Sequence, residues 1–286
     1  VEFEKVLFDI KINNVTKLVR TFPKKPFVPS NSDRLKERCE EILSMQATAL
    51  ATRIKHIGCK NIILGLSGGL DSTLALIVCV RAYNILSMNL KDIIAVTMPG
   101  FGTTNHTKNN SIALTEAYGV TLKDISIVDS VSQHFKDISH ESSVHDVAYE
   151  NSQARERTQI LMDLANKHNG IVVGTGDLSE LALGWATYNG DHMSMYGVNC
   201  SVPKTLVRFI VSFEAENVAT SNPKLSQVLH SVVDTPVSPE LLPPTESGDI
   251  SQKTEDLVGP YDLHDFFLYY FVRFGYEPSK IYRIAC

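Results

Sequence analysis

Short runs of β-branched and other apolar residues recur along the middle of the chain, separated by longer stretches in which apolar positions repeat at helical spacing. The short runs are predicted to be strands and the longer stretches helices. The strands are expected at 61–66, 93–97, 125–128 and 171–174, and the helices near 72–86, 104–118, 150–168 and 177–186. Continuous apolar strands that alternate with helices predict an α/β fold, a doubly wound parallel sheet covered on both faces.

Further helices are expected on either side of this alternating region. The first covers about 34–56, with Ser32 or Asp33 as its cap. In a parallel sheet ligands bind outside the carboxyl ends of the strands, so the loops after the predicted strands are expected to form the site. Later helices are expected to begin near Ser201 and Asn222, and a strongly aromatic one is expected over 261–274.

Two segments lack the pattern of regular structure. Residues 1–31 alternate only loosely and contain Pro23, Pro26 and Pro29, so we expect a linker from a missing upstream domain. Residues 235–260 are rich in Pro, Ser, Gly, Glu and Asp, which predicts a mobile lid. The domain itself is expected to span 32–286. Since the first residue is Val rather than Met, we expect this domain to be part of a longer chain.

Composition excludes several classes of function. The 286 residues carry a formal net charge of -5 and a pI near 6.0, without the basic stripe typical of nucleic-acid binding. The apolar runs are too short to cross a bilayer and no leader is evident, so a cytoplasmic protein without membrane contact is expected. The five cysteines are scattered without a CxxC pair, which fits reduced thiols rather than disulfides or a zinc site.

The strongest candidate for chemistry is SGGLDS, residues 67–72, which joins a predicted strand to a predicted helix. Adjacent glycines allow a tight turn, and the helix start adds partial positive charge, so an anion is expected there. The GxxxxGK[ST] and GxGxxG patterns are both absent from this loop. Asp71 would repel a phosphate about 4 Å away by about 4 kcal/mol at an effective dielectric of about 20, unless Mg²⁺ bridges the two. The alternative is a plain strand-to-helix turn with Asp71 as a first-turn acid.

SGGLDS resembles the pyrophosphatase loop of the ATP-cleaving amidotransferases, which include the NAD, GMP and argininosuccinate synthetases. Three further stretches, 174–194, 149–158 and 98–104, resemble the glutamine-dependent NAD synthetases, and the similarity covers about 32–275. The chain is therefore similar to the C-terminal synthetase domain of that family. The resemblance implies a Rossmann-like adenine nucleotide alpha hydrolase-type fold, also called the ATP pyrophosphatase fold.

The resemblance also implies which residues contact ATP and Mg²⁺. Asp71 and Glu180 match metal-binding positions, although by local rules alone Asp177 and Glu180 form a helix capping box. Lys204 is expected in the first turn of a helix capped by Ser201, where the macrodipole disfavours a cation unless an anion lies nearby. The implied ATP-contacting positions are Gly65, Leu66, Ser67, Gly68, Gly69, Leu70, Asp71, Ser72, Thr175, Lys204 and Ser238.

A second implied set approaches deamido-NAD, the nicotinic acid adenine dinucleotide. Asn151 and Arg155 share one helix face, which could equally be a solvated face, and Arg155 could pair with the pyrophosphate of the dinucleotide. Trp185 could stack on the pyridine ring, whereas a lone Trp is ordinarily core. On spacing alone Asp191 is a turn residue. The implied substrate set is Asn151, Arg155, Glu180, Trp185, Ala186, Thr187 and Tyr188, and the implied catalytic residues are Asp71, Asp191 and Lys204.

The implied reaction converts deamido-NAD to NAD in two steps. The substrate carboxylate attacks the α-phosphorus of ATP to give an acyl-adenylate and pyrophosphate, and ammonia then displaces AMP. Ammonia is expected either free or from a glutaminase domain of the full-length protein, and the aromatic helix suggests a homo-oligomer. The alternatives are another adenylating amidotransferase, such as GMP synthetase, and a non-catalytic nucleotide sensor, which would not need Asp71, Glu180 and Lys204 together.

Overall fold

The structure is a computed structural model of the chain, and it describes residues 3–8, 20–235, 241–242 and 254–286. Ser238 and most of the predicted lid lie outside the described residues, as does part of the predicted linker. Among the helices of the described residues, none is both long enough and apolar enough to cross a membrane.

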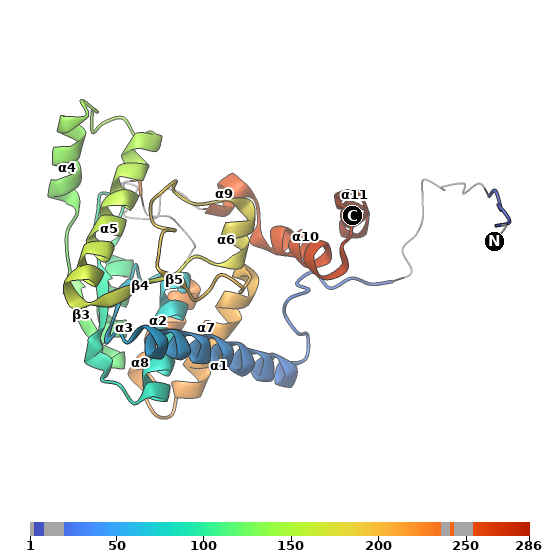
Figure 1. The fold of residues 1–286 in the computed structure, drawn as a ribbon, viewed down its shortest axis with the longest axis horizontal. Coiled ribbons are helices and arrows are strands. Elements are labelled where there is room, and N and C mark those ends of the chain that lie inside the picture. Colours follow the sequence, from blue (N-terminus) through green and yellow to red (C-terminus); the bar gives the residue numbers. More distant parts are fainter. Residues whose placement is uncertain (1–2, 9–19, 236–240, 243–253) are drawn as a thin grey trace.

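Five parallel strands form one sheet in the order β3, β2, β1, β4, β5 (Figure 1). From β1 the chain passes to β2 and β3, and it then returns to place β4 on the other side of β1. This reversal creates a switch point at the carboxyl ends of β1 and β4, where sheets of this kind bind ligands. The doubly wound parallel sheet is therefore confirmed. The strands are β1 (Asn61–Gly65), β2 (Ile93–Thr97), β3 (Thr121–Asp124), β4 (Gly170–Gly174) and β5 (Tyr196–Gly197).

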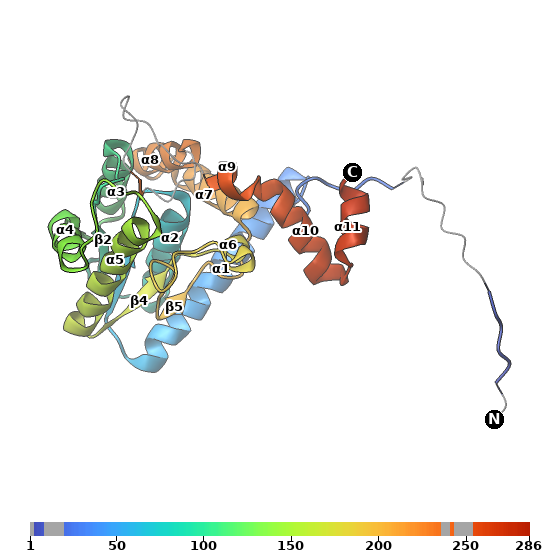
Figure 2. The ribbon, with the colours of Figure 1, turned by 90° about the horizontal axis from the view of Figure 1, so that it is seen from above.

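Successive residues of the strands face two separate hydrophobic cores, because side chains alternate across a sheet. Ile62 and Leu64 of β1 join the larger core, whereas Ile63 between them joins the smaller one. Helices therefore cover both faces (Figure 2). The larger core is closed by α1 (Ser32–Ile57), α2 (Leu70–Leu86), α3 (Asn105–Tyr118), α7 (Lys204–Val218) and α8 (Pro223–Asp234), and the smaller by α4 (Val128–Asp137) and α5 (Val147–His168).

The third predicted strand, 125–128, was wrong. Thr121–Asp124 pair with β2 and form the edge strand, and their side chains are at most half-buried. The apolar Ile127 lies beyond the strand, where it is fully buried in the smaller core and precedes α4. Apolar residues mark burial rather than backbone pairing, and an edge strand needs few of them.

Two predicted helix caps were also wrong. The side chain of Asn31, rather than Ser32 or Asp33, accepts the first free amides of α1. Helix α7 begins at Lys204 after Pro203, so Ser201 does not cap it. Helix α8 begins next to Asn222, as predicted, and the Asn222 side chain caps it. The helices α4, α9 (Thr254–Val258, within the predicted lid) and α11 (Pro278–Ala285) and the short strand β5 were not predicted.

The C-terminal helices α10 (Tyr261–Phe274) and α11 (Pro278–Ala285) extend beyond the sheet and its covering helices (Figures 1 and 2). Phe266, Tyr270 and Ile281 form a small core between them. The segment at 20–31 packs on the same helices, with the ring centroids of Phe22 and Tyr270 5.7 Å apart. Helix α10 is therefore held by both the N-terminal segment and the body of the protein.

We expect Gly68→Ala to lower the free energy of unfolding by about 2–4 kcal/mol. Gly68 has a φ of +83°, and a Cβ atom built there would lie 2.2 Å from the carbonyl oxygen of Thr107. Denaturant unfolding measures the loss. Gly69→Ala is the matched control, because its φ is -90° and its Cβ would meet only Ser67 Oγ at 3.4 Å. Equal losses in the two variants would contradict this account of the turn.

Candidate functional site

The loop that follows β1 presents free backbone amides at the start of α2. The hydroxyl of Ser67 accepts a hydrogen bond from Gly69 N at 3.2 Å and lies 3.1 Å from the hydroxyl of Ser72. No side chain caps α2, since Gly69 occupies the capping position. Amides and dipole at such a helix start attract an anion. The predicted ATP-loop residues, 65–72, run from the end of β1 through this turn into the start of α2.

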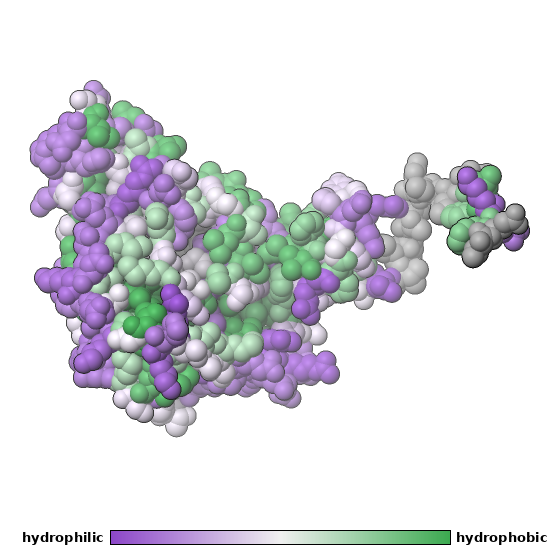
Figure 3. Space-filling view, in the orientation of Figure 1, coloured by the Kyte–Doolittle hydropathy of each residue, from purple (hydrophilic) through white to green (hydrophobic). Residues whose placement is uncertain are grey.

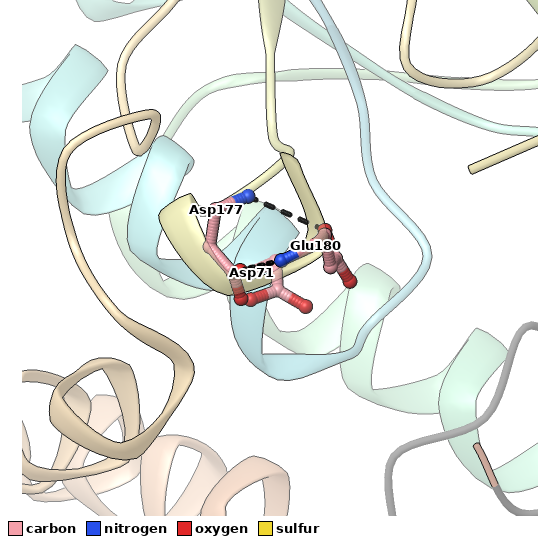
Figure 4. A group of neighbouring side chains, drawn as sticks. All are labelled: Asp71, Asp177 and Glu180. Carbon is pink, nitrogen blue, oxygen red and sulfur yellow. Dashed lines mark hydrogen bonds between the residues drawn. The ribbon is translucent and has the colours of Figure 1, made fainter. Parts of the chain in front are cut away.

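Beside this turn, the ammonium group of Lys204 contacts three carboxylates. Its Nζ lies 2.7 Å from Asp71 Oδ2, 2.8 Å from Asp177 Oδ2 and 2.8 Å from Glu180 Oε1. The Lys204 side chain is only 4% exposed. Figure 4 shows the three carboxylates converging from the starts of α2 and α6 (Leu178–Leu183). We call these four residues the Lys204 cluster.

The local sequence explains why two of the carboxylates point the same way. Asp177 Oδ1 accepts the backbone N–H of Glu180 at 2.8 Å, and Glu180 Oε2 accepts that of Asp177 at 3.3 Å. This is the capping box predicted from local rules. The second oxygen of each carboxylate remains free to contact Lys204. Capping and cluster formation therefore coexist.

The cluster carries more negative than positive charge in a buried place. Burial and the neighbouring Asp71 raise the pKa of Asp177 to about 8, and the same two causes raise the pKa of Glu180. Burial alone would lower the pKa of Lys204, but the ion pairs with the three carboxylates outweigh it and hold that pKa well above its usual value. Lys204 is therefore a cation, and three carboxyl groups share its single positive charge.

The cluster can accommodate a divalent cation. One oxygen from each of Asp71, Asp177 and Glu180 lies within 4.8 Å of the others. Asp71 Oδ1 is buried and accepts no hydrogen bond from the described residues. Carboxylate oxygens with spare lone pairs and excess negative charge are the donors that a hard cation prefers. The predicted pair Asp71 and Glu180 thus lies together, and Asp177 joins it.

Asn199 is a site residue that the sequence reasoning missed. Its buried amide donates to the backbone oxygens of Asp71 at 2.9 Å and Thr175 at 3.0 Å. Its oxygen accepts from Gln46 of α1 at 3.2 Å. Asn199 therefore joins the loops after β1 and β4, and Thr175 takes part through its backbone. No sequence signal distinguishes this asparagine from an ordinary turn residue.

The predicted substrate residues form a second group, next to the cluster. Arg155 of α5 donates from Nε and Nη2 to the backbone oxygen of Tyr188, each at 3.2 Å. Trp185 follows α6, is half-buried and belongs to neither large core, so its ordinary core role does not apply. Asn151 is half-buried one turn before Arg155. The remaining two residues of the set, Ala186 and Thr187, lie between Trp185 and Tyr188.

One predicted catalytic residue lies apart from the Lys204 cluster. Asp191 is exposed in a turn, and within the described chain it makes no hydrogen bond or ion pair with the cluster. The spacing argument for a turn residue is confirmed at this position. Ser238 lies outside the described residues.

A phosphate-type turn and a carboxylate cluster at the switch point of a doubly wound sheet are typical of nucleotide-binding α/β proteins. The family model for NAD synthase matches residues 42–223, and the chain belongs to this family. Its Rossmann-like adenine nucleotide alpha hydrolase-type fold agrees with the sequence expectation.

Relatives and solved structures extend the comparison. The glutamine-dependent NAD(+) synthetases of Mycobacterium bovis and Mycobacterium leprae are each 44% identical, over 94% and 92% of this chain. The chain spans only 40% and 39% of those two proteins. The NMN synthetase of Francisella tularensis superposes with a TM-score of 0.67 at 21% identity, over 86% of this chain and 91% of that one. The glutamine-dependent NAD+ synthetase of Acinetobacter baumannii, solved in complex with ADP, superposes with a TM-score of 0.60 at 24% identity. The match covers 86% of this chain and 43% of that one.

We expect Lys204→Met to lower the free energy of unfolding by about 3–5 kcal/mol at pH 8 and by less at pH 5. Without the ammonium, Asp177 and Glu180 take up protons in the folded state, so their folded pKa values, which burial already raises, exceed the unfolded ones. Stability that depends on those protons is present at low pH and lost as the pH rises through the folded values. Urea unfolding at the two pH values measures this.

Lys224→Met is the matched control for this variant, because Lys224 pairs with Glu116 at 3.0 Å with both side chains at least 60% exposed. Exposed pairs contribute about 0–1 kcal/mol. A small, pH-independent loss in Lys204→Met would show that the cluster is not the buried ion network described.

Proposed function

We propose that the chain carries out the ATP-dependent amidation of deamido-NAD to NAD through an acyl-adenylate, releasing AMP and pyrophosphate. The observation that carries the proposal is the Lys204 cluster beside the uncapped start of α2. Membership of the NAD synthase family supports the substrate class. The similar Acinetobacter baumannii protein was solved with ADP, which supports an adenine nucleotide as co-substrate.

The residues of the turn and the cluster have distinct roles in this reaction. The α2 amides behind Gly68 and Gly69 bind phosphate oxygens, because they have no side-chain cap. The ammonium of Lys204 lies beside Asp71 at the start of α2, and there it stabilises the negative charge that develops on the departing pyrophosphate. Most of the rate enhancement is positioning and charge stabilisation, so no side-chain nucleophile is required.

Mg²⁺ is the proposed cation, held by Asp71 and Glu180 with Asp177 beside them. When bound, it neutralises the negative charge on the phosphates of ATP. The carboxylates supply hard oxygen ligands, and the buried Asp71 Oδ1 is the best placed of them because it has no other partner among the described residues.

The second group of residues is proposed to bind deamido-NAD. Arg155 donates to the backbone oxygen of Tyr188 and so holds this loop. Its guanidinium is exposed and can also contact a pyrophosphate. The half-buried ring of Trp185 offers a flat face to the pyridine. Asp191 is proposed to approach the reacting carboxyl only when substrate is bound, and Ser238 to contact ATP.

Ammonia is the proposed nitrogen donor, supplied free or by a glutaminase domain in the full-length protein. Hydrolysis of glutamine usually needs a thiolate. Burial raises the pKa of Cys39 to about 11 and raises those of Cys59 and Cys79. These three buried thiols are therefore poor nucleophiles.

A homo-oligomer is proposed as well, since α10 exposes Phe271, Val272 and Phe274.

Pyrophosphate release with a panel of acceptors tests the proposed reaction. Purified chain, ATP, Mg²⁺ and ammonium are mixed with deamido-NAD, nicotinic acid mononucleotide, xanthosine monophosphate or no acceptor. We expect release with deamido-NAD well above the other three reactions, together with AMP and NAD. Release with xanthosine monophosphate alone would favour a GMP synthetase, and ATP binding without any release would favour a nucleotide sensor.

Asp71→Asn should reduce pyrophosphate release by about 100-fold or more, while ATP binding is weakened but detectable. The variant keeps the amides of the α2 start but loses the carboxylate charge of the proposed metal ligand. Steady-state rates and calorimetric ATP titration measure the two effects. Asp124→Asn, which alters a partly exposed pair with Lys108 away from the Lys204 cluster, is the control. Wild-type turnover in Asp71→Asn would remove Asp71 from the site.

Trp185→Ala should weaken deamido-NAD binding by about tenfold, the scale of one lost stacking contact. ATP binding should change less than about twofold, because the link between Trp185 and the Lys204 cluster is a backbone hydrogen bond to Glu180, which the substitution keeps. Separate KM values for the two substrates give the comparison, and Tyr282→Ala, an exposed aromatic of α11, is the control. Equal losses for both substrates, or a lower melting temperature, would indicate a structural role.

A further inference from the structure

Asp265 is a buried carboxylate of α10 that lies outside the Lys204 cluster. It is 1% exposed. Its Oδ2 accepts hydrogen bonds from Thr205 N at 2.9 Å and Thr205 Oγ1 at 2.6 Å, and its Oδ1 accepts from the hydroxyl of Ser179. All three donors belong to α6 or α7, the helices that carry Glu180 and Lys204.

The partners of Asp265 are the immediate neighbours of the cluster residues. Ser179 lies between Asp177 and Glu180 in the chain, and Thr205 follows Lys204. Ser179 Oγ also accepts the backbone N–H of Lys204 at 2.9 Å. A continuous set of hydrogen bonds therefore runs from the carboxylate of Asp265 through Ser179 to the backbone of Lys204.

This arrangement supplies the cap that the sequence of α7 lacks. Pro203 precedes the helix and provides no side-chain hydrogen bond. The free amides of Lys204 and Thr205 would be left without partners in a buried place, at a substantial cost. A cation in the first turn is also disfavoured by the helix dipole, and an anion at the same end offsets this. Asp265 provides that anion from a different helix.

Among the described residues, the surroundings of Asp265 offer few other polar groups. A cavity of about 220 Å³ lies beside it between α6, α10 and α11, and its wall is mainly apolar. Figure 3 shows apolar surface gathered between α6 and α10 on this face. Leu183 and Phe271, which line the cavity, are partly exposed. Helix α10 also places the ring of Tyr261 5.3 Å from Lys204 Nζ. The position of Lys204 thus depends on α10 at both its backbone and its ammonium.

We propose that Asp265 is a positioning residue for Lys204. By holding the start of α7 against Ser179, it keeps the lysine directed at the three carboxylates, although it touches neither them nor the ammonium. The structural part of this inference is independent of the reaction. Only its expected effect on rate rests on the proposed function.

Lysine footprinting tests the structural part without any substrate. The folded chain is exposed briefly to an amine-acylating reagent, and the modification of each lysine is measured by mass spectrometry. In the wild type, Lys204 is expected to be protected, because it is buried and ion-paired. Asp265→Ala should raise its modification by at least about tenfold, the factor expected for loss of a charged hydrogen bond. Asp265→Asn, which keeps an acceptor oxygen, should give a smaller increase.

Two further variants make the footprint specific. Ser179→Ala removes only the link between Asp265 and the backbone of Lys204, and it should raise the modification of Lys204 even if Asp265→Ala fails to fold. Asp262→Asn lies on the same helix but changes only an exposed pair with Lys25, so Lys204 should stay protected. Unchanged protection of Lys204 in folded Asp265→Ala and Ser179→Ala would overturn the proposal. A uniform increase at all lysines would also overturn it, since that indicates general destabilisation.

Steady-state kinetics test the effect on rate. With deamido-NAD, ATP and Mg²⁺, Asp265→Ala should lower kcat by about tenfold or more, with the KM for deamido-NAD within about twofold, because Lys204 is placed to act on the departing pyrophosphate. If the modification of Lys204 rises but kcat is unchanged, the positioning of Lys204 does not limit this reaction and the kinetic claim fails. If the wild type itself has no activity, the proposed function fails and the footprint still decides the structural claim.

Discussion

Three helices begin within reach of one ammonium group, and their relative positions depend on it. Asp71 comes from the start of α2, Asp177 and Glu180 from the start of α6, and Lys204 from the start of α7. Buried like charges repel strongly, so without the lysine these helix starts converge only at a cost in stability. Three carboxyl groups share one ammonium, so the cluster has oxygen ligands to spare for a further cation. The same constraint thus produces both the structure of the site and its proposed chemistry.

The sheet topology determines which helix starts meet. Strands β2 and β3 are added on one side of β1 and β4 on the other, which brings the loops after β1 and β4 side by side. Asn199 joins the two loops through hydrogen bonds to the backbone oxygens of Asp71 and Thr175. Helix α7 then enters from the end of the sheet near β5. Because each contributor lies on a regular element, the geometry is fixed before any ligand binds, which is the condition for electrostatic stabilisation of a transition state.

Local sequence patterns predicted much of this, and their failures have a common cause. Strand and helix periodicity located β1, β2, β4 and most helices, and the glycine turn located the anion site. The edge strand β3 was misplaced because its pairing with β2 is a long-range backbone property that leaves its side chains polar. Asp177 was interpreted only as a cap, although its second oxygen faces Lys204. Asp265 and Asn199 could not be found, since their partners are 24 or more residues away and belong to other elements of the fold.

The central claim is that Lys204 and Asp71 stabilise one another within a single buried network. A double-mutant cycle with Lys204→Met and Asp71→Asn, measured by denaturant unfolding without ligands, tests it most directly. The account predicts a coupling free energy of about 1–3 kcal/mol. Asp71→Asn should be much less destabilising in the Lys204→Met background, because the negative charge of Asp71 then has no ammonium partner and its removal relieves repulsion. Additive effects of the two substitutions would contradict the claim.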